Sequence, residues 1–224
     1  MPRLLLLSLL AAASVHAQEA ARDLKVRFLA DSPLPETSKL AIDFGKMTAA
    51  FDLPLTNLSG PLDVPRSFSM HAQDKEETLA KVTLPENGKE FIVLLIATPD
   101  ATYKPVVIPD KDPSFEPGSM YFYNSTDKTV VCHIGSSKVV LEPGIGKSLK
   151  PEGAENGVYD TAFSVRQGAE IRQINSARWP VDSKKRTYVF FSWNPETKDV
   201  AFHMVEETTS SGGGKPKGKS KARK

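Results

Sequence analysis

Short apolar stretches separated by turn residues run along most of this chain, and no long window keeps the period of a helix. This pattern is typical of β-strands joined by short loops. It predicts about seven strands in each of two successive segments, the number found in an immunoglobulin-like sandwich. The expected strands lie near residues 24–30, 40–44, 48–51, 67–71, 78–84, 90–97 and 103–109, then near 120–124, 129–134, 138–141, 161–166, 170–178, 187–193 and 200–205.

The second set of strands repeats the first at a spacing of about 95 residues. The tripeptide that starts at Phe68 matches the one that starts at Phe163 (163 − 68 = 95), and the apolar run at Phe91 matches the run at Tyr188 (188 − 91 = 97). Length differences between the copies fall in loops, as expected of divergent duplicates. The alternative is a chance likeness between short-strand sequences.

The sequence therefore predicts an all-β fold of two tandem immunoglobulin-like β-sandwich domains related by internal duplication. The expected boundaries are residues 18–110 for the first repeat and 119–207 for the second. A linker with two prolines is expected at residues 111–118.

Two of the predicted strands, 92–96 and 188–193, are apolar at nearly every position. A strand with one face in solvent alternates between apolar and polar residues, so these strands are expected to be covered on both faces. The other repeat is the simplest cover, although short core strands also tolerate a few exposed aliphatic residues. The residues expected at this repeat interface are Ile92, Leu94, Ile96, Phe191 and Trp193.

Residues 1–17 have the features of a signal peptide. Arg3 is followed by the apolar run 4–13 and by a small-x-small cleavage signal at 15–17. The alternative is a buried N-terminal helix. No later segment reaches about 18 consecutive apolar residues, so no transmembrane segment is predicted. Cys132 is the single cysteine, which excludes an intramolecular disulfide and favours a bacterial periplasmic, envelope-associated or extracellular location.

The net charge of +2 hides an uneven distribution. Between the leader and the tail, 22 basic residues stand against 27 acidic ones, a net charge of −5, whereas segment 208–224 is expected to be a disordered basic tail. Such a tail favours an anionic envelope polymer or lipid headgroups as partner, and its lack of aromatic residues argues against nucleic acid. The alternatives are a solubility tail and a tail that folds back on the acidic body. The expected polyanion-binding residues are Lys215, Lys217, Lys219, Lys221, Arg223 and Lys224.

Motifs that suggest catalysis are incomplete. The tripeptide 146–148, Gly-Lys-Ser, lacks the earlier glycine of a phosphate-binding loop, because position 141 is leucine, and a hairpin loop is predicted there instead. The sequence 125–128 matches S-x-x-K without its companion motifs. No close cluster of ligands follows from the positions of His71, His133 and His203. No catalytic, cofactor-binding or metal site is therefore predicted.

Segments 26–33, 176–179 and 187–191 resemble exported bacterial proteins of unknown function, of a type found in the Verrucomicrobia, that carry tandem immunoglobulin-like β-sandwiches. The resemblance covers about residues 24–206. It implies the fold and export, and it brings no catalytic residues.

The expected function is that of an exported, non-catalytic structural or adhesive protein of the cell envelope, which the basic tail tethers to polyanions. The alternative is a glycan- or peptide-binding module that uses the groove between the repeats. A hydrolase is a third possibility, for which the sequence offers no nucleophile or metal constellation.

Overall fold

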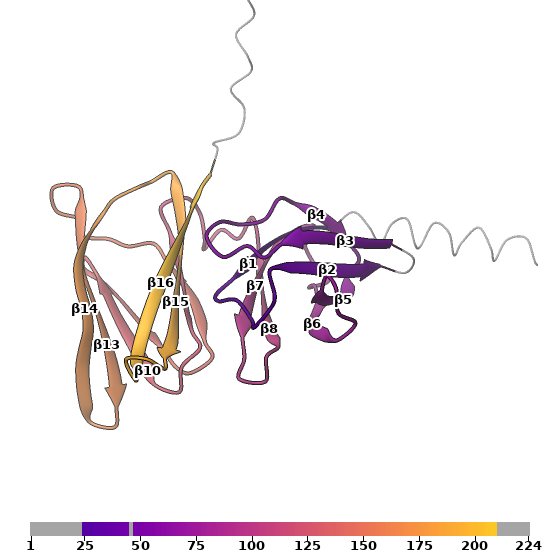
Figure 1. Cartoon of the computed structure of the whole chain (residues 1–224). Coiled ribbons are helices and arrows are strands. Elements are labelled where there is room, and N and C mark those ends of the chain that lie inside the picture. Colours follow the sequence, from indigo (N-terminus) through magenta and orange to yellow (C-terminus); the bar gives the residue numbers. More distant parts are fainter. Residues whose placement is uncertain (1–23, 45–46, 210–224) are drawn as a thin grey trace, which may run out of the picture.

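The computed structural model describes residues 24–44 and 47–209, and within these ranges the chain forms strands and no helix (Figure 1). Sixteen strands make four four-stranded sheets in two similar halves, β1–β8 and β9–β16. No helix of the described part is long and apolar enough to cross a membrane. The predicted signal peptide and the six tail cations lie outside the described residues.

The strands alternate short apolar runs with turns, as the sequence pattern predicts. Those of the first half are β1 (Leu24–Ala30), β2 (Lys39–Phe44), β3 (Met47–Asp52), β4 (Leu62–Val64), β5 (Ser67–Ala72), β6 (Thr78–Thr83), β7 (Glu90–Ala97) and β8 (Tyr103–Pro109). Those of the second half are β9 (Met120–Asn124), β10 (Thr129–Ile134), β11 (Ser137–Leu141), β12 (Gly146–Leu149), β13 (Val158–Gln167), β14 (Glu170–Pro180), β15 (Lys185–Asn194) and β16 (Asp199–Thr208).

The two halves share one topology. The sheets of the first half have the orders β4-β1-β7-β8 and β3-β2-β5-β6, and those of the second half have the orders β12-β9-β15-β16 and β11-β10-β13-β14. Each strand of the second half therefore takes the place of the strand numbered eight lower. The single parallel pair also recurs, since β1 runs parallel to β7 and β9 runs parallel to β15.

Two short strands, β4 and β12, were not predicted from the sequence. The second of them contains Gly146-Lys147-Ser148, so the expected hairpin loop at this tripeptide was wrong: Lys147 pairs with Phe122 of β9. The turn comes just before, where the amide of Ile145 donates to the carbonyl oxygen of Glu142 over 3.1 Å. Gly146 is needed for packing, because a Cβ there would lie 2.1 Å from the hydroxyl oxygen of Tyr121.

Each half encloses its own apolar core between its two sheets. Phe28, Leu40 and Phe91 are fully buried in the first core. In the second, the Phe163 ring is packed edge-on against Phe191 with 5.2 Å between the ring centroids. A third buried cluster, described below, lies between the halves.

The halves differ along one side. In the first half, β6 and β8 approach each other and close the gap between the two sheets. Among the described residues, their counterparts β14 and β16 make no comparable approach. The long β13–β14 hairpin projects beyond the rest of its half (Figure 1). The second half therefore has a more open side, bounded by β14 and β16, which Arg172 of β14 and Asp199 of β16 bridge by an ion pair near the β13–β14 turn.

Candidate functional site

A buried apolar cluster joins the two halves, which lie side by side in Figure 1. Its members come from β1, β7 and β8 of the first half, from β9, β15 and β16 of the second, and from the connecting segment. We call it the junction cluster: Leu29, Ile92, Leu94, Ile96, Ile108, Phe115, Tyr121, Tyr123, Tyr188, Phe190 and Val205. Phe115 of the connecting segment packs edge-on against Tyr188, with 5.2 Å between the ring centroids. The segment that connects the two halves is therefore also part of the contact between them.

The structure places three of the five expected interface residues, Ile92, Leu94 and Ile96, in the junction cluster, and it does not place the other two there. Phe191 belongs to the core of the second half, and Trp193 is 51% exposed. The repeat aligns β7 with β15 at an offset of 97, which pairs Leu94 with Phe191 and Ile96 with Trp193. In the structure the residues of β15 in the junction cluster are Tyr188 and Phe190, which lie an even number of residues from those of β7. Because side chains of a strand alternate between its two faces, the odd offset predicts the wrong face of β15.

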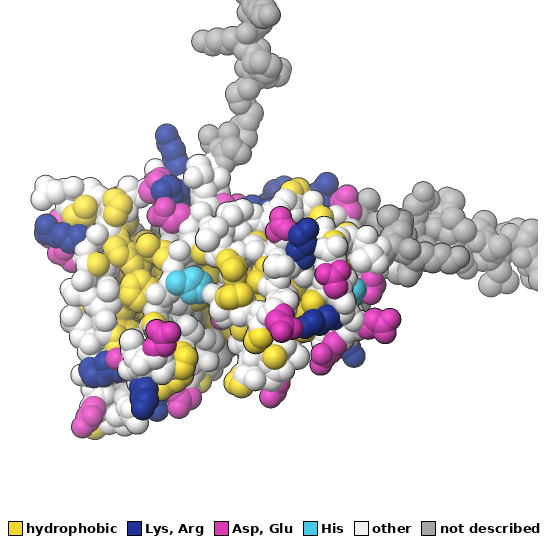
Figure 2. Space-filling model, viewed as in Figure 1, with side chains coloured by type: hydrophobic (Ala, Val, Ile, Leu, Met, Phe, Trp, Pro, Cys, Tyr) yellow, Lys and Arg dark blue, Asp and Glu magenta, His cyan; other side chains and the backbone are white. Residues whose placement is uncertain are grey.

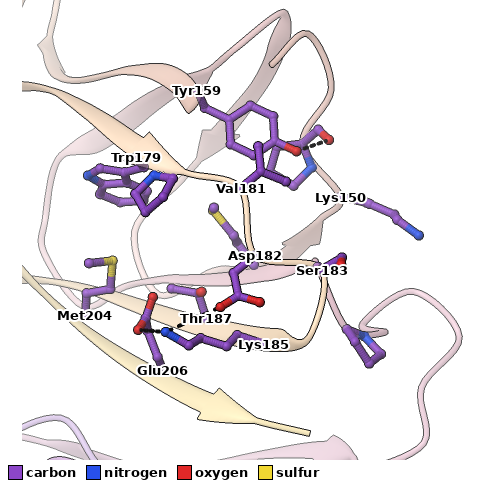
Figure 3. Close-up of a pocket in the computed structure, with 15 residues that line it drawn as sticks. Lys150, Tyr159, Trp179, Val181, Asp182, Ser183, Lys185, Thr187, Met204 and Glu206 are labelled. Carbon is purple, nitrogen blue, oxygen red and sulfur yellow. Dashed lines mark hydrogen bonds and ion pairs between the residues drawn. The ribbon is translucent and has the colours of Figure 1, made fainter. Parts of the chain in front are cut away.

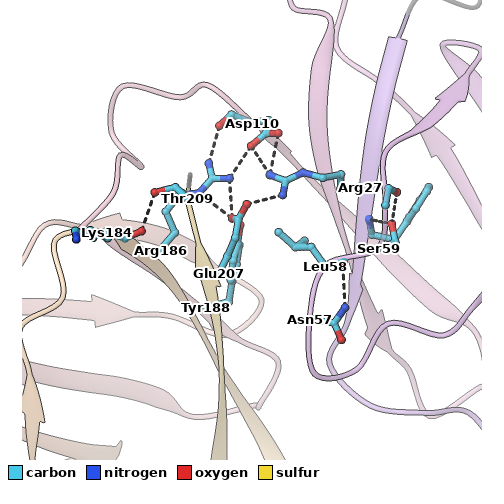
Figure 4. A network of polar contacts seen from close by, with 12 residues as sticks. Arg27, Asn57, Leu58, Ser59, Asp110, Lys184, Arg186, Tyr188, Glu207 and Thr209 are labelled. Carbon is cyan, nitrogen blue, oxygen red and sulfur yellow. Dashed lines mark hydrogen bonds and ion pairs between the residues drawn. The ribbon is translucent and has the colours of Figure 1, made fainter. Parts of the chain in front are cut away.

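A polar network closes one edge of the junction cluster (Figure 4). Arg27 of β1 donates to Glu207 of β16 (Nη1–Oε1, 2.5 Å) and to both carboxylate oxygens of Asp110 (2.7 and 2.9 Å). Arg186 of β15 donates to Glu207 (Nε–Oε2, 2.9 Å) and to Asp110 (Nη2–Oδ1, 2.7 Å). The hydroxyl of Tyr188 also donates to Glu207, over 3.0 Å. Two arginines and two carboxylates from both halves therefore form a closed ring.

The electrostatics of this network favour the charged forms. The side chains of Arg186 and Glu207 are only 6% and 13% exposed. Burial opposes ionisation of Asp110, but hydrogen bonds from Arg186 and Arg27 outweigh it and lower the pKa of that carboxyl. Burial likewise opposes the charge of Arg186, yet the pKa of its guanidinium is raised by the nearby anionic groups. Each charge of the ring has two partners of the opposite sign, as a buried ionic group requires.

The histidines and the cysteine lie apart from one another. Nε2 of His71 is 3.0 Å from a carboxylate oxygen of Asp43, on the first half. His203 of β16 stacks on Phe190 with 4.9 Å between ring centroids, and desolvation lowers its pKa. Cys132 is buried, which raises its pKa, whereas its neighbour His133 is exposed on the opposite face. Among the described residues, no three His, Cys, Asp or Glu side chains gather as a metal site would require.

A pocket of about 190 Å³ opens at one end of the second half, between its two sheets (Figure 3). We call it the end pocket. Its walls come from β9, β13, β14, β15 and β16, from the loop that joins β14 to β15, and from the segments just before β9 and just after β12. The apolar part of the lining includes Met120, Pro151, Tyr159, Trp179, Val181 and Met204.

Charged side chains line the rest of the end pocket. Nζ of Lys185 lies 2.8 Å from Glu206 and 3.5 Å from Asp182, and Lys150 stands on the side away from Trp179 (Figure 3). The hydrogen bond that Lys185 donates to Glu206 raises the pKa of the Lys185 ammonium group. Asp182, Lys185 and Glu206 lie together at the cavity, whereas the ammonium group of Lys150 points outward in Figure 3; counted together, the four charges of the lining cancel.

Trp179 connects the end pocket to the core. Its ring lies 5.3 Å from the Phe163 ring and 6.3 Å from the Phe202 ring, measured between centroids. Trp179 packs against the core of the second half and is only partly buried. The pocket itself was not predicted, because its walls come from strand ends far apart in the sequence.

The open side of the second half continues from the end pocket. Hydrophobic side chains gather there, between β14 and β16 (Figure 2). Of the large hydrophobic side chains near this side, Trp193 of β15 is 51% exposed and Met204 of β16 is 43% exposed. Soluble proteins expose contiguous apolar patches chiefly where they bind something.

Comparison with known proteins assigns the chain to no family. No protein-family model matches the sequence, and no curated protein matches it.

Proposed function

We propose that this chain is an exported, non-catalytic structural or adhesive protein of the cell envelope. In this proposal its halves are two immunoglobulin-like sandwiches that arose by internal duplication and act as one rigid body. The repeated strand order supports the common origin, because all eight strands and the parallel pair recur in the same places. The observation that carries the functional proposal is the junction cluster with its polar network, which joins the halves by both apolar and ionic contacts.

A rigid pair of lobes suits a protein that transmits or resists force between two attachments better than one that must open and close. Domains joined by small polar contacts move relative to each other by default, whereas a large apolar interface suppresses that motion. Here the shared cluster includes side chains with no exposed surface, such as Ile92, Leu94 and Tyr188.

We propose the basic tail as one of the two attachments. Lys215, Lys217, Lys219, Lys221, Arg223 and Lys224 lie outside the described residues, so this part of the proposal depends on the sequence alone. An anionic envelope polymer or lipid headgroup is the partner that six clustered cations favour.

Removing residues 215–224 is expected to abolish association with heparin and with phosphatidylglycerol vesicles at low salt. Binding by the full chain should weaken steeply as salt rises, with a slope of log K against log salt of roughly −4 to −5 if all six cations engage. Cosedimentation over a salt series measures both effects. A variant with the six cations replaced by glutamine is the matched control for tail length. Unchanged association of the truncated chain at low salt would rule out the tether.

A glycan- or peptide-binding module remains the second candidate function, and the end pocket favours it. The groove between the repeats, where the sequence analysis expected such a site, is filled by the junction cluster. The end pocket combines aromatic and apolar walls with a few convergent polar groups, which is the usual composition of a ligand site.

A further inference from the structure

We propose that the end pocket binds one sugar ring of a neutral glycan, with Trp179 as the stacking platform and the Asp182–Lys185–Glu206 group as the hydroxyl-binding side. This inference rests on the second candidate function above and names the ligand class and the residues. It does not depend on the tail.

The apolar wall suits the face of a sugar ring. The C–H groups of a pyranose form an apolar face that packs on an aromatic ring, while the hydroxyls stay at its rim. Trp179 is held in place from behind by Phe163 and Phe202, so its orientation is fixed before a ligand arrives. Met204 lies on the same side of the pocket in Figure 3 and extends this wall, and 43% of its surface is exposed.

The polar wall suits hydroxyl groups. Lys185 already bridges Glu206 at 2.8 Å and Asp182 at 3.5 Å, so the three side chains form a preorganised set of donors and acceptors. Ring hydroxyls can donate to the carboxylates and accept from the ammonium group without breaking the ion pair. Charge-assisted hydrogen bonds of this kind are stronger than those between neutral groups.

The charge balance and the size of the pocket select the ligand class. Since Lys150 and Lys185 offset Asp182 and Glu206, neither an anion nor a cation gains a net Coulombic advantage. A volume of about 190 Å³ accommodates one ring rather than a drug-sized molecule. A purely apolar side chain of a peptide would make no use of the donors and acceptors that the charged wall retains beyond its own ion pairs, and would shield them from water. The remaining sugars of an oligosaccharide can lie along the open side between β14 and β16.

The first half serves as an internal comparison. Leu84 holds the place that Trp179 has in the repeat (179 − 84 = 95), and it is only 2% exposed. There, β6 and β8 also close the side that is open in the second half. The tryptophan and the opening therefore occur together in one copy, as expected if the second copy has acquired a binding site.

Tryptophan fluorescence of the full chain tests the proposal. The sequence has two tryptophans, so Trp193→Phe leaves Trp179 as the only reporter. Titration with cellotetraose, chitotetraose and mannotetraose is expected to give a saturable change in its emission with at least one of them. Glu206→Gln, in the same background, should weaken that binding by at least about tenfold, because a charge-assisted hydrogen bond is lost.

The substitution Trp179→Leu introduces the residue that the first half has at the equivalent position. It should abolish binding in a calorimetric titration with the same sugar. Arg178→Ala changes the neighbouring exposed residue on the opposite face of β14 and should leave the affinity unchanged. Absence of a saturable change with all three sugars up to about 10 mM, the range of weak single-ring affinities, would overturn the proposal. Saturation by an apolar peptide or by heparin instead would overturn the ligand class. Tail-dependent association with vesicles should be the same in the Trp179→Leu chain, so the two proposals fail independently.

Discussion

Replacing Phe190 by alanine is expected to lower the free energy of unfolding by about 3–5 kcal/mol, the usual cost of truncating a buried phenylalanine. Phe190 is 1% exposed, lies in the junction cluster and stacks on His203. The cavity left by its ring would be shared by both halves. Urea denaturation followed by circular dichroism measures the loss.

Trp193→Ala is the control for this substitution. Trp193 lies on the same strand, β15, but is 51% exposed, so its truncation should change the free energy of unfolding by less than about 1 kcal/mol. Because the junction cluster couples the halves, Phe190→Ala should also split the unfolding curve into two steps. If the two variants lost the same free energy of unfolding, or if Phe190→Ala still unfolded in one step at an unchanged urea concentration, the halves would not be coupled through this cluster.

Replacing Arg186 by alanine is the second substitution with a large expected effect, a loss of about 3–5 kcal/mol. The guanidinium is 6% exposed, and without it Asp110 and Glu207 would share Arg27 as their one remaining cation within the ring. A buried carboxylate without sufficient partners is costly, so most of the loss comes from the anions left behind. Thermal and urea unfolding at neutral pH measure it.

Arg178→Ala is the matched control for Arg186→Ala. Its ion pair with Asp160 joins side chains that are 72% and 71% exposed, so its removal should change stability by at most about 1 kcal/mol. High salt should weaken the Arg178 pair while leaving the effect of Arg186→Ala nearly unchanged, because buried pairs are screened less. Comparable losses for both arginines would contradict the assignment of the network as buried and partnered.

The same network predicts sensitivity to acid. The folded-state pKa of Asp110 lies below its usual value, so the stability it contributes is present above about pH 4 and is lost as the pH falls through the folded pKa. Stability measured from pH 7 to pH 3 should therefore decline less steeply in Asp110→Asn than in the natural chain. Parallel declines in the two proteins would show that Asp110 is not the titrating group.

Most strands could be predicted from the sequence because apolar runs and turn residues alternate at short, regular intervals. The strand β4 has only three residues, of which Val64 alone is β-branched, and β12 (Gly-Lys-Ser-Leu) has no β-branched or aromatic residue to make it recognisable as a strand. A repeat comparison located the partner strands β7 and β15. It could not assign their faces, since a shift of one residue reverses every side chain, as Phe191 and Trp193 show.

The polar features of the molecule depend on contacts between distant segments. Arg27 and Glu207 are 180 residues apart in the sequence, and nothing local distinguishes them from surface charges. The end pocket likewise combines Lys150 with Trp179 and Glu206, which only the fold brings together. Glu206 and Glu207 are neighbours in the sequence. The alternation of β16 sends the two side chains to different sites, one to the pocket and one to the ring of arginines.

The proposed function requires above all that the two halves form one rigid body. Backbone ¹⁵N relaxation of residues 18–224 tests this directly, because it reports the rotational diffusion of each half separately. Halves joined by the junction cluster should share a single diffusion tensor, with a correlation time appropriate to the whole protein. Two different tensors, each with the shorter correlation time of a half-sized domain, would contradict it.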